Sequence, residues 1–438
     1  MADARASAQN LGAAGRRLWR RSTRGVRGTL ARRKGLLAYF AILGPGMVAA
    51  NAGNDAGGIA TYASTGATYG YRLLWVMLPI AISLAIVQEM CARMGAVTGK
   101  GLADLIRERF GVRWAALVML ALLVANTGVT ISEFVGIAAA SELFGVSRFI
   151  SVPLAALGVW WLVVRGSYRR VERVFLTMSL VFLGYIISAF LARPQWSAVW
   201  RGTTRPSFEN LDSAYLFTII ALIGTTISPY MQVFVQSSVV EKGVRVEDYN
   251  LTRADVWVGT VFSISISFFI IISTAAALNL HGIGIETAAD AARALEPLAG
   301  RYATVLFATG LLGASLLAAG VLPLATAYSI SEAFGFEKGV SHSFREAPIF
   351  IGIFTFLVAV GAFVAILPGL PVISVLLTTQ VINGLLLPII LIAVLRLASD
   401  RELMGERANG RIYNVAAWLT VGVVSALSVL LIVVTLFW

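Results

Sequence analysis

Asp55 is a carboxylate in a stretch of sequence that is poorly suited to a continuous helix. The stretch AYFAILGPGMVAANAGNDAGGIATYAS places Pro45 and several glycines, among them Gly57 and Gly58, around Asp55. Glycine and proline free backbone N–H and carbonyl groups from helical hydrogen bonds, and those groups then need other partners. We predict that Asp55 and the adjacent Asn54 help to hold a ligand; the alternative is a kinked packing helix with a satisfied buried aspartate.

A second stretch, YLFTIIALIGTTISPYMQVFVQSSVVEKG, interrupts an apolar run in the same way. Thr225, Ser228 and Pro229 stand at the interruption, and Gln232 continues a polar face beyond it. Free carbonyls and the C-terminal end of a half-helix present negative dipole ends, which suit a cation. The two interruptions together therefore predict one cation site.

Three further polar residues lie in apolar segments. Gln380 and Asn383 are three positions apart, so they share one side of a helix, and Glu133 lies in the segment TISEFVG. These side chains could face the interrupted helices, or they could only join helices by hydrogen bonds, which is common in membrane bundles.

The composition shows which solvent surrounds these elements. The chain has 438 residues, is 58% hydrophobic and 13% charged, and has a mean hydropathy of +0.80. Soluble domains are about 25% charged, so a soluble enzyme and a disordered chain are excluded. The alternating pattern of a membrane barrel is absent, which leaves an all-α integral membrane protein. Because a crossing takes about 20 apolar residues, we predict eleven transmembrane helices, at 37–64, 71–95, 114–140, 149–165, 172–192, 213–240, 256–279, 302–333, 348–367, 371–397 and 413–437.

The net charge of +12 is concentrated in an N-terminal tail. Residues 1–34 hold ten of the 35 lysines and arginines and one acid, or +9, which leaves +3 for the remaining 404 residues. We predict that the tail, residues 1–36, is cytoplasmic and meets anionic headgroups rather than nucleic acid. The loops after every second span are also basic, so we expect a multi-pass protein of the cell membrane with its N-terminus inside. The single cysteine, Cys91, excludes an intrachain disulfide.

The two interrupted spans are the first and the sixth. Five spans separate equivalent positions in two inverted repeats of five helices, and such repeats place a substrate site at mid-membrane. We therefore predict one transporter domain over residues 37–438, with repeat one at about 37–192, repeat two at about 213–397 and an extra helix at about 413–437. The sequence indicates no oligomeric state.

Four stretches of the chain resemble the Nramp divalent-metal transporters, and more closely their Nramp-related magnesium transporter branch. NDAGGIAT stands where that family has Asp-Pro-Gly-Asn, and GTTISPYMQVFVQSSVV stands where it has Met-Pro-His. VQEMCARMGAVTGKGLADLIRERFG is similar to the second helix and its loop, and LTTQVINGLLLP to the tenth helix. The resemblance implies a LeuT-type fold with broken helices 1 and 6, and transport of divalent metal.

The resemblance also implies roles for single residues. Asp55 matches the metal-binding aspartate and Gln380 the tenth-helix glutamine, whereas Gly58 replaces a metal-binding asparagine. Ser228 stands where the family has its methionine, and Thr225 would offer a carbonyl or a hydroxyl. A secondary polar pathway would include Asn54, Tyr230, Met231, Gln232, Asn383, Glu133 and Thr130.

These departures from the family pattern bear on the cargo. A thioether favours transition metals over hard cations, so Ser228 removes that bias and frees volume. Mg²⁺ keeps several waters and is usually bound through one or two carboxylates. We therefore expect uptake of largely hydrated Mg²⁺, and also of Mn²⁺, with no cofactor.

Proton coupling is not expected. Glu133 matches an acid linked to proton movement, but Thr130 replaces a second acid, and the two histidines, His281 and His342, lie in loops. The alternatives are a proton-coupled Mn²⁺/Fe²⁺ transporter and an amine or amino-acid carrier of the same fold. An intramembrane enzyme is not predicted, because Ser228 has no histidine in its span and no His–Glu zinc motif is present.

Overall fold

The computed structural model describes residues 54–165, 183–207, 212–244, 246–293, 295–296, 300–337 and 346–437. The predicted tail at 1–36, the first part of span one with Pro45, most of span five and the basic loop at 338–345 lie outside these residues. Over the described residues the secondary structure is helical, as predicted, and contains no strand. The helices are α4 Ala56–Tyr69, α5 Leu74–Thr98, α6 Leu102–Phe110, α7 Val112–Leu143, α8 Arg148–Arg165, α10 Leu183–Leu191, α11 Trp196–Thr204, α12 Ser213–Thr226, α13 Pro229–Glu241, α14 Tyr249–Ala277, α15 Ala288–Arg293, α17 Ala303–Phe334, α18 Pro348–Ala365, α19 Val372–Ser399, α20 Arg401–Met404 and α21 Arg411–Phe437.

Eight segments of the described chain are long and apolar enough to cross a membrane, and α8 is a shorter apolar helix. These nine segments fall on nine of the eleven predicted spans. The other two predicted spans, the first and the fifth, are described only at their C-terminal ends, as α4 and α10.

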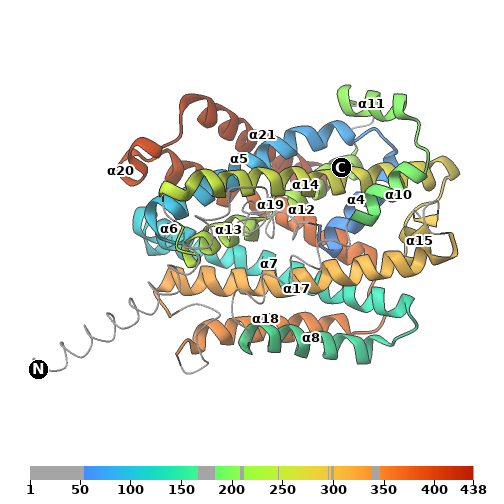
Figure 1. Cartoon of the computed structure of the whole chain (residues 1–438), viewed down its shortest axis with the longest axis horizontal. Helices are drawn as coiled ribbons and strands as arrows, with labels where there is room; N and C mark the ends of the chain where they lie inside the picture. The colour runs from blue at the N-terminus through green and yellow to red at the C-terminus, as the bar shows by residue number, and fades with distance from the viewer. Residues whose placement is uncertain are drawn as a thin grey trace, which may run out of the picture. The chain divides into compact units, whose positions relative to one another are not determined.

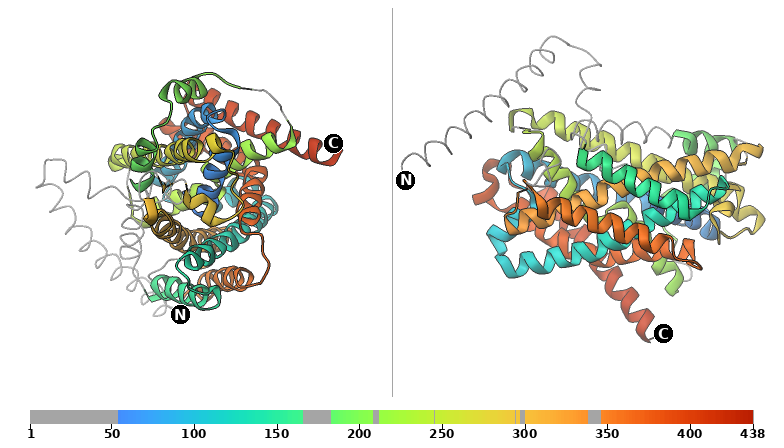
Figure 2. Two further views of the ribbon diagram at one scale, coloured as in Figure 1. Left: turned by 90° about the vertical axis from the view of Figure 1, so that its right-hand side faces the viewer. Right: turned by 90° about the horizontal axis from the view of Figure 1, so that it is seen from below.

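The helices pack in pairs that take one member from each predicted repeat. α5 packs against α14, α7 against α17, and α8 against α18. Figure 1 shows α7 and α17 side by side along the bundle, with α8 and α18 together at one side; the end-on view in Figure 2 shows the same arrangement. Non-equivalent helices also pack together, as α4 does against α14 and α7 against α18, and the division into two inverted repeats stays a prediction.

The predicted interruption of the sixth span is present; that of the first span falls partly outside the described residues, which begin at Asn54. α4 begins at Ala56, directly after Asp55, and α12 ends at Thr226 before α13 begins at Pro229. Proline is favoured in the first turn of a helix because it has no N–H to leave unpaired. Pro229 therefore explains why the second half of this span starts where it does.

Besides the short helices α15 and α20, two nine-residue helices, α6 and α11, lie in stretches that were predicted as loops. α6 is at the same end of the bundle as α20, on the left in Figure 1, and α11 is at the opposite end, on the right. Arg109 of α6 pairs with Asp400 at 2.6 Å and with Glu402 at 2.7 Å. Both helices are too short and too polar to be detected by a search for spans.

Candidate cation site

Asp55 caps α4 with one carboxylate oxygen. Its Oδ1 accepts the backbone N–H of Gly58 at 2.5 Å, while Oδ2 has no hydrogen-bond partner among the described residues. The side chain is completely buried. A buried carboxylate oxygen without a partner carries a large desolvation cost, so Oδ2 is the oxygen that is available to a ligand.

Glu133 brings a second carboxylate to the same helix end. Its Oε2 accepts a hydrogen bond from the backbone N–H of Ala56 at 3.1 Å, and its Oε1 accepts one from the Ser132 hydroxyl at 3.3 Å. Thr130, one turn away on α7, does not join them. Its hydroxyl donates to the Asn126 carbonyl at 2.7 Å within its own helix.

The gap between α12 and α13 lies around Ser228. The Ser228 hydroxyl bonds back to the carbonyls of Gly224 at 2.7 Å and Thr225 at 3.2 Å. The Thr225 hydroxyl has no partner among the described residues and is completely buried. The gap therefore presents helix-end carbonyls and a free hydroxyl, and the negative end of the α12 dipole points to the same place.

Helix α19 joins the two interrupted spans. The Gln380 amide lies so close to Gly57 that a Cβ on that glycine would overlap it, and the Gln380 carbonyl packs equally closely on Gly224. Asn383 donates to Gln380 Oε1 at 3.3 Å and to the Ser228 hydroxyl at 3.4 Å. The prediction that Gln380 and Asn383 share one face is confirmed, and that face is turned to the interrupted spans.

Asn54 is held by a partner that the sequence reasoning missed. Its amide nitrogen donates to Ser263 Oγ at 3.0 Å, and its oxygen accepts the Ser267 hydroxyl at 2.8 Å. Both serines belong to α14 and are spaced by four residues, which places them on one helix face. The alternation SISIS at 263–267, which places several serines in an apolar helix, was the sequence signal that could have pointed to these partners. Asn54 is thereby occupied and ties the start of α4 to α14.

The remaining residues of the predicted pathway lie on α13. Tyr230 is completely buried in its first turn, and Gln232 donates weakly to the Ser228 carbonyl at 3.4 Å. The Met231 sulfur accepts the Gln88 amide at 3.9 Å and is thereby engaged with α5. Gly58 contributes its backbone N–H to Asp55 and has no side chain to offer.

A set of unpartnered polar atoms therefore gathers where α4, α12, α13 and α19 meet. Buried polar groups are nearly always hydrogen-bonded, so such a cluster suits a ligand or water. The donor set is dominated by oxygen, which suits hard cations such as Mg²⁺ and Mn²⁺. Among the described residues the side-chain atoms without a partner at this junction are Asp55 Oδ2, Thr225 Oγ1, Gln232 Oε1, Gln380 Nε2 and Asn383 Oδ1.

Comparison with protein families gives a match over nearly the whole chain. The family model for Nramp, described as natural resistance-associated macrophage protein-like, matches residues 46–434. The divalent metal cation transporter MntH of Pectobacterium carotovorum is 30% identical over 412 residues, which cover 91% of this chain and 95% of that protein. MntH of Deinococcus radiodurans is 29% identical over 421 residues, which cover 92% of each.

Solved structures show the same fold. The Eremococcus coleocola manganese transporter superposes with a TM-score of 0.72 at 19% identity, over 91% of this chain and 88% of that one. MhsT in complex with L-phenylalanine superposes with a TM-score of 0.59 at 14% identity, over 89% of this chain and 98% of that one. The predicted LeuT-type architecture is thereby confirmed.

Proposed function

Because the chain belongs to the Nramp family, we propose that it carries divalent metal cations across a membrane by alternating access, with Mg²⁺ as the main cargo and Mn²⁺ as a second. The single observation that carries this proposal is the buried, unpartnered oxygen of Asp55 at the start of α4, which packs against α12 and α19. The curated relatives are named as divalent metal cation transporters, and one structural neighbour is named as a manganese transporter.

The preference for Mg²⁺ is argued from the ligands. In the gap between α12 and α13, Ser228 offers a hydroxyl and no sulfur, and the nearby Met231 sulfur accepts the Gln88 amide. The cation would therefore meet oxygen atoms from Asp55, Thr225 and the α12 carbonyls. Such a set, with one carboxylate and retained waters, suits Mg²⁺ better than soft metals. Gln380 and Asn383 would hold those waters through their amides.

Transport without protons is supported by how the nearby groups are used. Glu133 acts as an acceptor for the first turn of α4, and Thr130 bonds within α7. His281 ends a short 3-10 helix that follows α14, and it is exposed. A membrane potential is sufficient as the driving force, because two charges that cross 100 mV gain about 4.6 kcal/mol. This is on the order of a thousandfold accumulation.

The proposed topology follows the basic loops. We place the tail 1–36 and α6 on the cytoplasmic side, and α11 on the outside. Repeat one then covers about 37–192 and repeat two about 213–397, with α21 as an extra helix.

The test is flux into proteoliposomes that contain a pH-sensitive dye. With a potassium gradient and valinomycin setting about −100 mV, we expect Mg²⁺ and Mn²⁺ to accumulate without a matching change of internal pH. Vesicles with Asp55→Asn protein are the control and should stay near background. Acidification in proportion to metal flux would overturn uncoupled transport, and uptake of amines in place of metal would overturn the cargo.

A further inference from the structure

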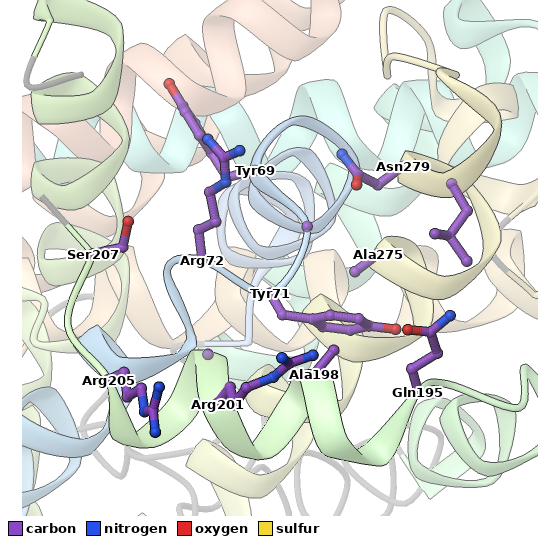
Figure 3. Close-up of a pocket in the computed structure, with 13 residues that line it drawn as sticks. Tyr69, Tyr71, Arg72, Gln195, Ala198, Arg201, Arg205, Ser207, Ala275 and Asn279 are labelled. Carbon is purple, nitrogen blue, oxygen red and sulfur yellow. The ribbon is translucent and has the colours of Figure 1, made fainter. Parts of the chain in front are cut away.

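A pocket of about 400 Å³ lies at the α11 end of the bundle, away from the cation site. Its lining comes from the turn between α4 and α5, from α11, and from the end of α14. Figure 3 shows these residues together. Three arginines line the pocket and, among the described residues around it, no carboxylate does; the lining residues that matter here are Arg72, Arg201, Arg205, Tyr71, Gln195 and Asn279.

The charge of this pocket is opposite to what a cation path needs. Arg72, Arg201 and Arg205 are exposed, and none has a salt bridge among the described residues. The next described acid after α11, Asp212, caps α12 by accepting the Tyr215 N–H at 2.8 Å, while Glu209 lies outside the described residues. Arginine presents a planar fork of donors that matches the oxygens of phosphate or carboxylate. The pocket therefore suits an anion.

Helix α11 has two faces of different chemistry. At about 100° per residue, Arg201, Gly202 and Arg205 fall on one face, which lines the pocket. Trp196 and Trp200 fall on the opposite face and are 48% and 70% exposed. Tryptophan is enriched where a membrane meets water, at the level of the headgroups. With Trp196 and Trp200 at the level of the headgroups, the arginines on the other face of α11 lie at that level too.

The backbone of α11 and the turn before α5 are in close contact. A Cβ on Gly202 would overlap the Tyr71 carbonyl, so only glycine allows this approach. The Tyr71 hydroxyl is buried and has no partner among the described residues, and in Figure 3 it points toward Gln195. It is a donor in addition to the arginines, in a pocket that needs donors to hold an anion.

We propose that this pocket binds the phosphate group of an anion, held by Arg72, Arg201 and Arg205 with the Tyr71 hydroxyl as a further donor. The phosphate is either that of an anionic lipid headgroup or free inorganic phosphate. Because Arg72 belongs to the α4–α5 turn, Arg201 to α11 and Arg205 to the position directly after α11, the bound anion ties these two elements together. The site is separate from the cation site and carries the opposite charge.

The first experiment uses the purified full-length protein in a neutral detergent, without divalent metal, titrated with inorganic phosphate at constant ionic strength. Binding is read from the shift of the thermal unfolding midpoint. We expect each of Arg72→Gln, Arg201→Gln and Arg205→Gln to weaken binding by about fivefold, as for partly exposed charge pairs, and the triple variant to abolish it. The matched control is Arg113→Gln, an exposed arginine on α7 outside the pocket, which should bind as the wild type does.

The second experiment separates the two sources of phosphate. The wild type and the triple variant are compared in nanodiscs of phosphatidylglycerol and of phosphatidylcholine. Stabilisation by phosphatidylglycerol that the triple variant lacks assigns the site to a headgroup; a response to inorganic phosphate in detergent assigns it to the free ion. The proposal is overturned if neither ligand stabilises the wild type, or if the triple variant responds as the wild type does. Mg²⁺ uptake by Arg201→Gln protein should stay near wild type, which shows that the variant is folded.

Discussion

The carboxylate of Glu133 accepts the backbone N–H of Ala56 at 3.1 Å, which joins α7 to the first turn of α4. Ala56 directly follows Asp55, so two buried acids meet at the N-terminus of one helix. The first turn of a helix has N–H groups without intrahelical partners and the positive end of the dipole. Burying either carboxylate would be costly on its own. The free N–H groups and the positive end of the dipole offset that cost for both.

Removing the charge of Asp55 should stop transport without unfolding the protein. In Asp55→Asn the amide oxygen can still accept the Gly58 N–H, but the ionic ligand is lost. We expect Mg²⁺ uptake to fall at least about tenfold, with a thermal unfolding midpoint near that of the wild type. The measurement is radiotracer or dye-based uptake into proteoliposomes. Glu286→Gln, which removes an exposed loop acid, is the control; wild-type uptake by Asp55→Asn protein would show that the site lies elsewhere.

Putting a sulfur in the gap between α12 and α13 should change the preference among metals. We expect Ser228→Met to raise the ratio of Mn²⁺ or Cd²⁺ uptake to Mg²⁺ uptake by about tenfold, because a thioether is a soft ligand. Ser228→Leu has a similar volume and no sulfur, so it should lower all fluxes without changing their ratio. Competition between metals in one vesicle preparation gives the ratio directly. If Ser228→Met and Ser228→Leu changed the ratio of metal fluxes equally, the proposal that a sulfur ligand sets the preference would be contradicted.

Glu133 should matter as an acceptor rather than as a proton carrier. In Glu133→Gln the amide oxygen can still accept the Ala56 N–H, so we expect a maximal rate near wild type. The half-saturating metal concentration should rise by about tenfold at most, since a nearby negative charge is lost. Glu133→Ala leaves the Ala56 N–H unpaired, at a cost of about 1–3 kcal/mol, and should lose both stability and rate. Equal failure of the two variants, measured by uptake and thermal unfolding, would point to a role for the proton.

Variants at the contact between Gly57 and Gln380 should change thermal stability and transport independently of each other. Gly57→Ala overpacks this contact, and overpacking costs about 1–3 kcal/mol. Adding Gln380→Ala removes the overlapping amide, so the double variant should regain thermal stability but still transport poorly. Gly158→Ala, on α8 where a Cβ meets nothing within 4 Å, is the control and should be neutral. A double variant as unstable as Gly57→Ala alone would mean that the two residues do not press on each other.

Much of the fold follows from local signals in the sequence. Apolar length alone locates the spans, and Pro229 marks the start of α13, because proline is favoured in the first turn of a helix. The spacing of Gln380 and Asn383 is enough to put both on one face of α19. The sequence predicts a site at Asp55 because an acid in an apolar segment is costly to bury unless it binds a partner.

The contacts between distant segments could not be predicted in this way. The bonds of Asn54 to Ser263 and Ser267 join residues more than 200 positions apart, and a serine in an apolar helix has many other partners available. Thr130 matched a pathway position, yet its hydroxyl bonds within its own helix, as threonine often does. The helices α6 and α11 lie outside the spans, where apolar length gives no signal.

The two carboxylate oxygens of Asp55 are in different hydrogen-bonding states, and this difference affects how well Ca²⁺ could bind there. One oxygen caps α4 through Gly58, and only the other is open to a cargo ion. Ca²⁺ often takes both oxygens of one carboxylate, whereas Mg²⁺ is satisfied with one and keeps its waters. An ion that claims both must first release the Gly58 N–H, and losing a helix cap costs about 0.5–2 kcal/mol. We therefore expect the Gly58–Asp55 hydrogen bond to favour Mg²⁺ over Ca²⁺ at the proposed site.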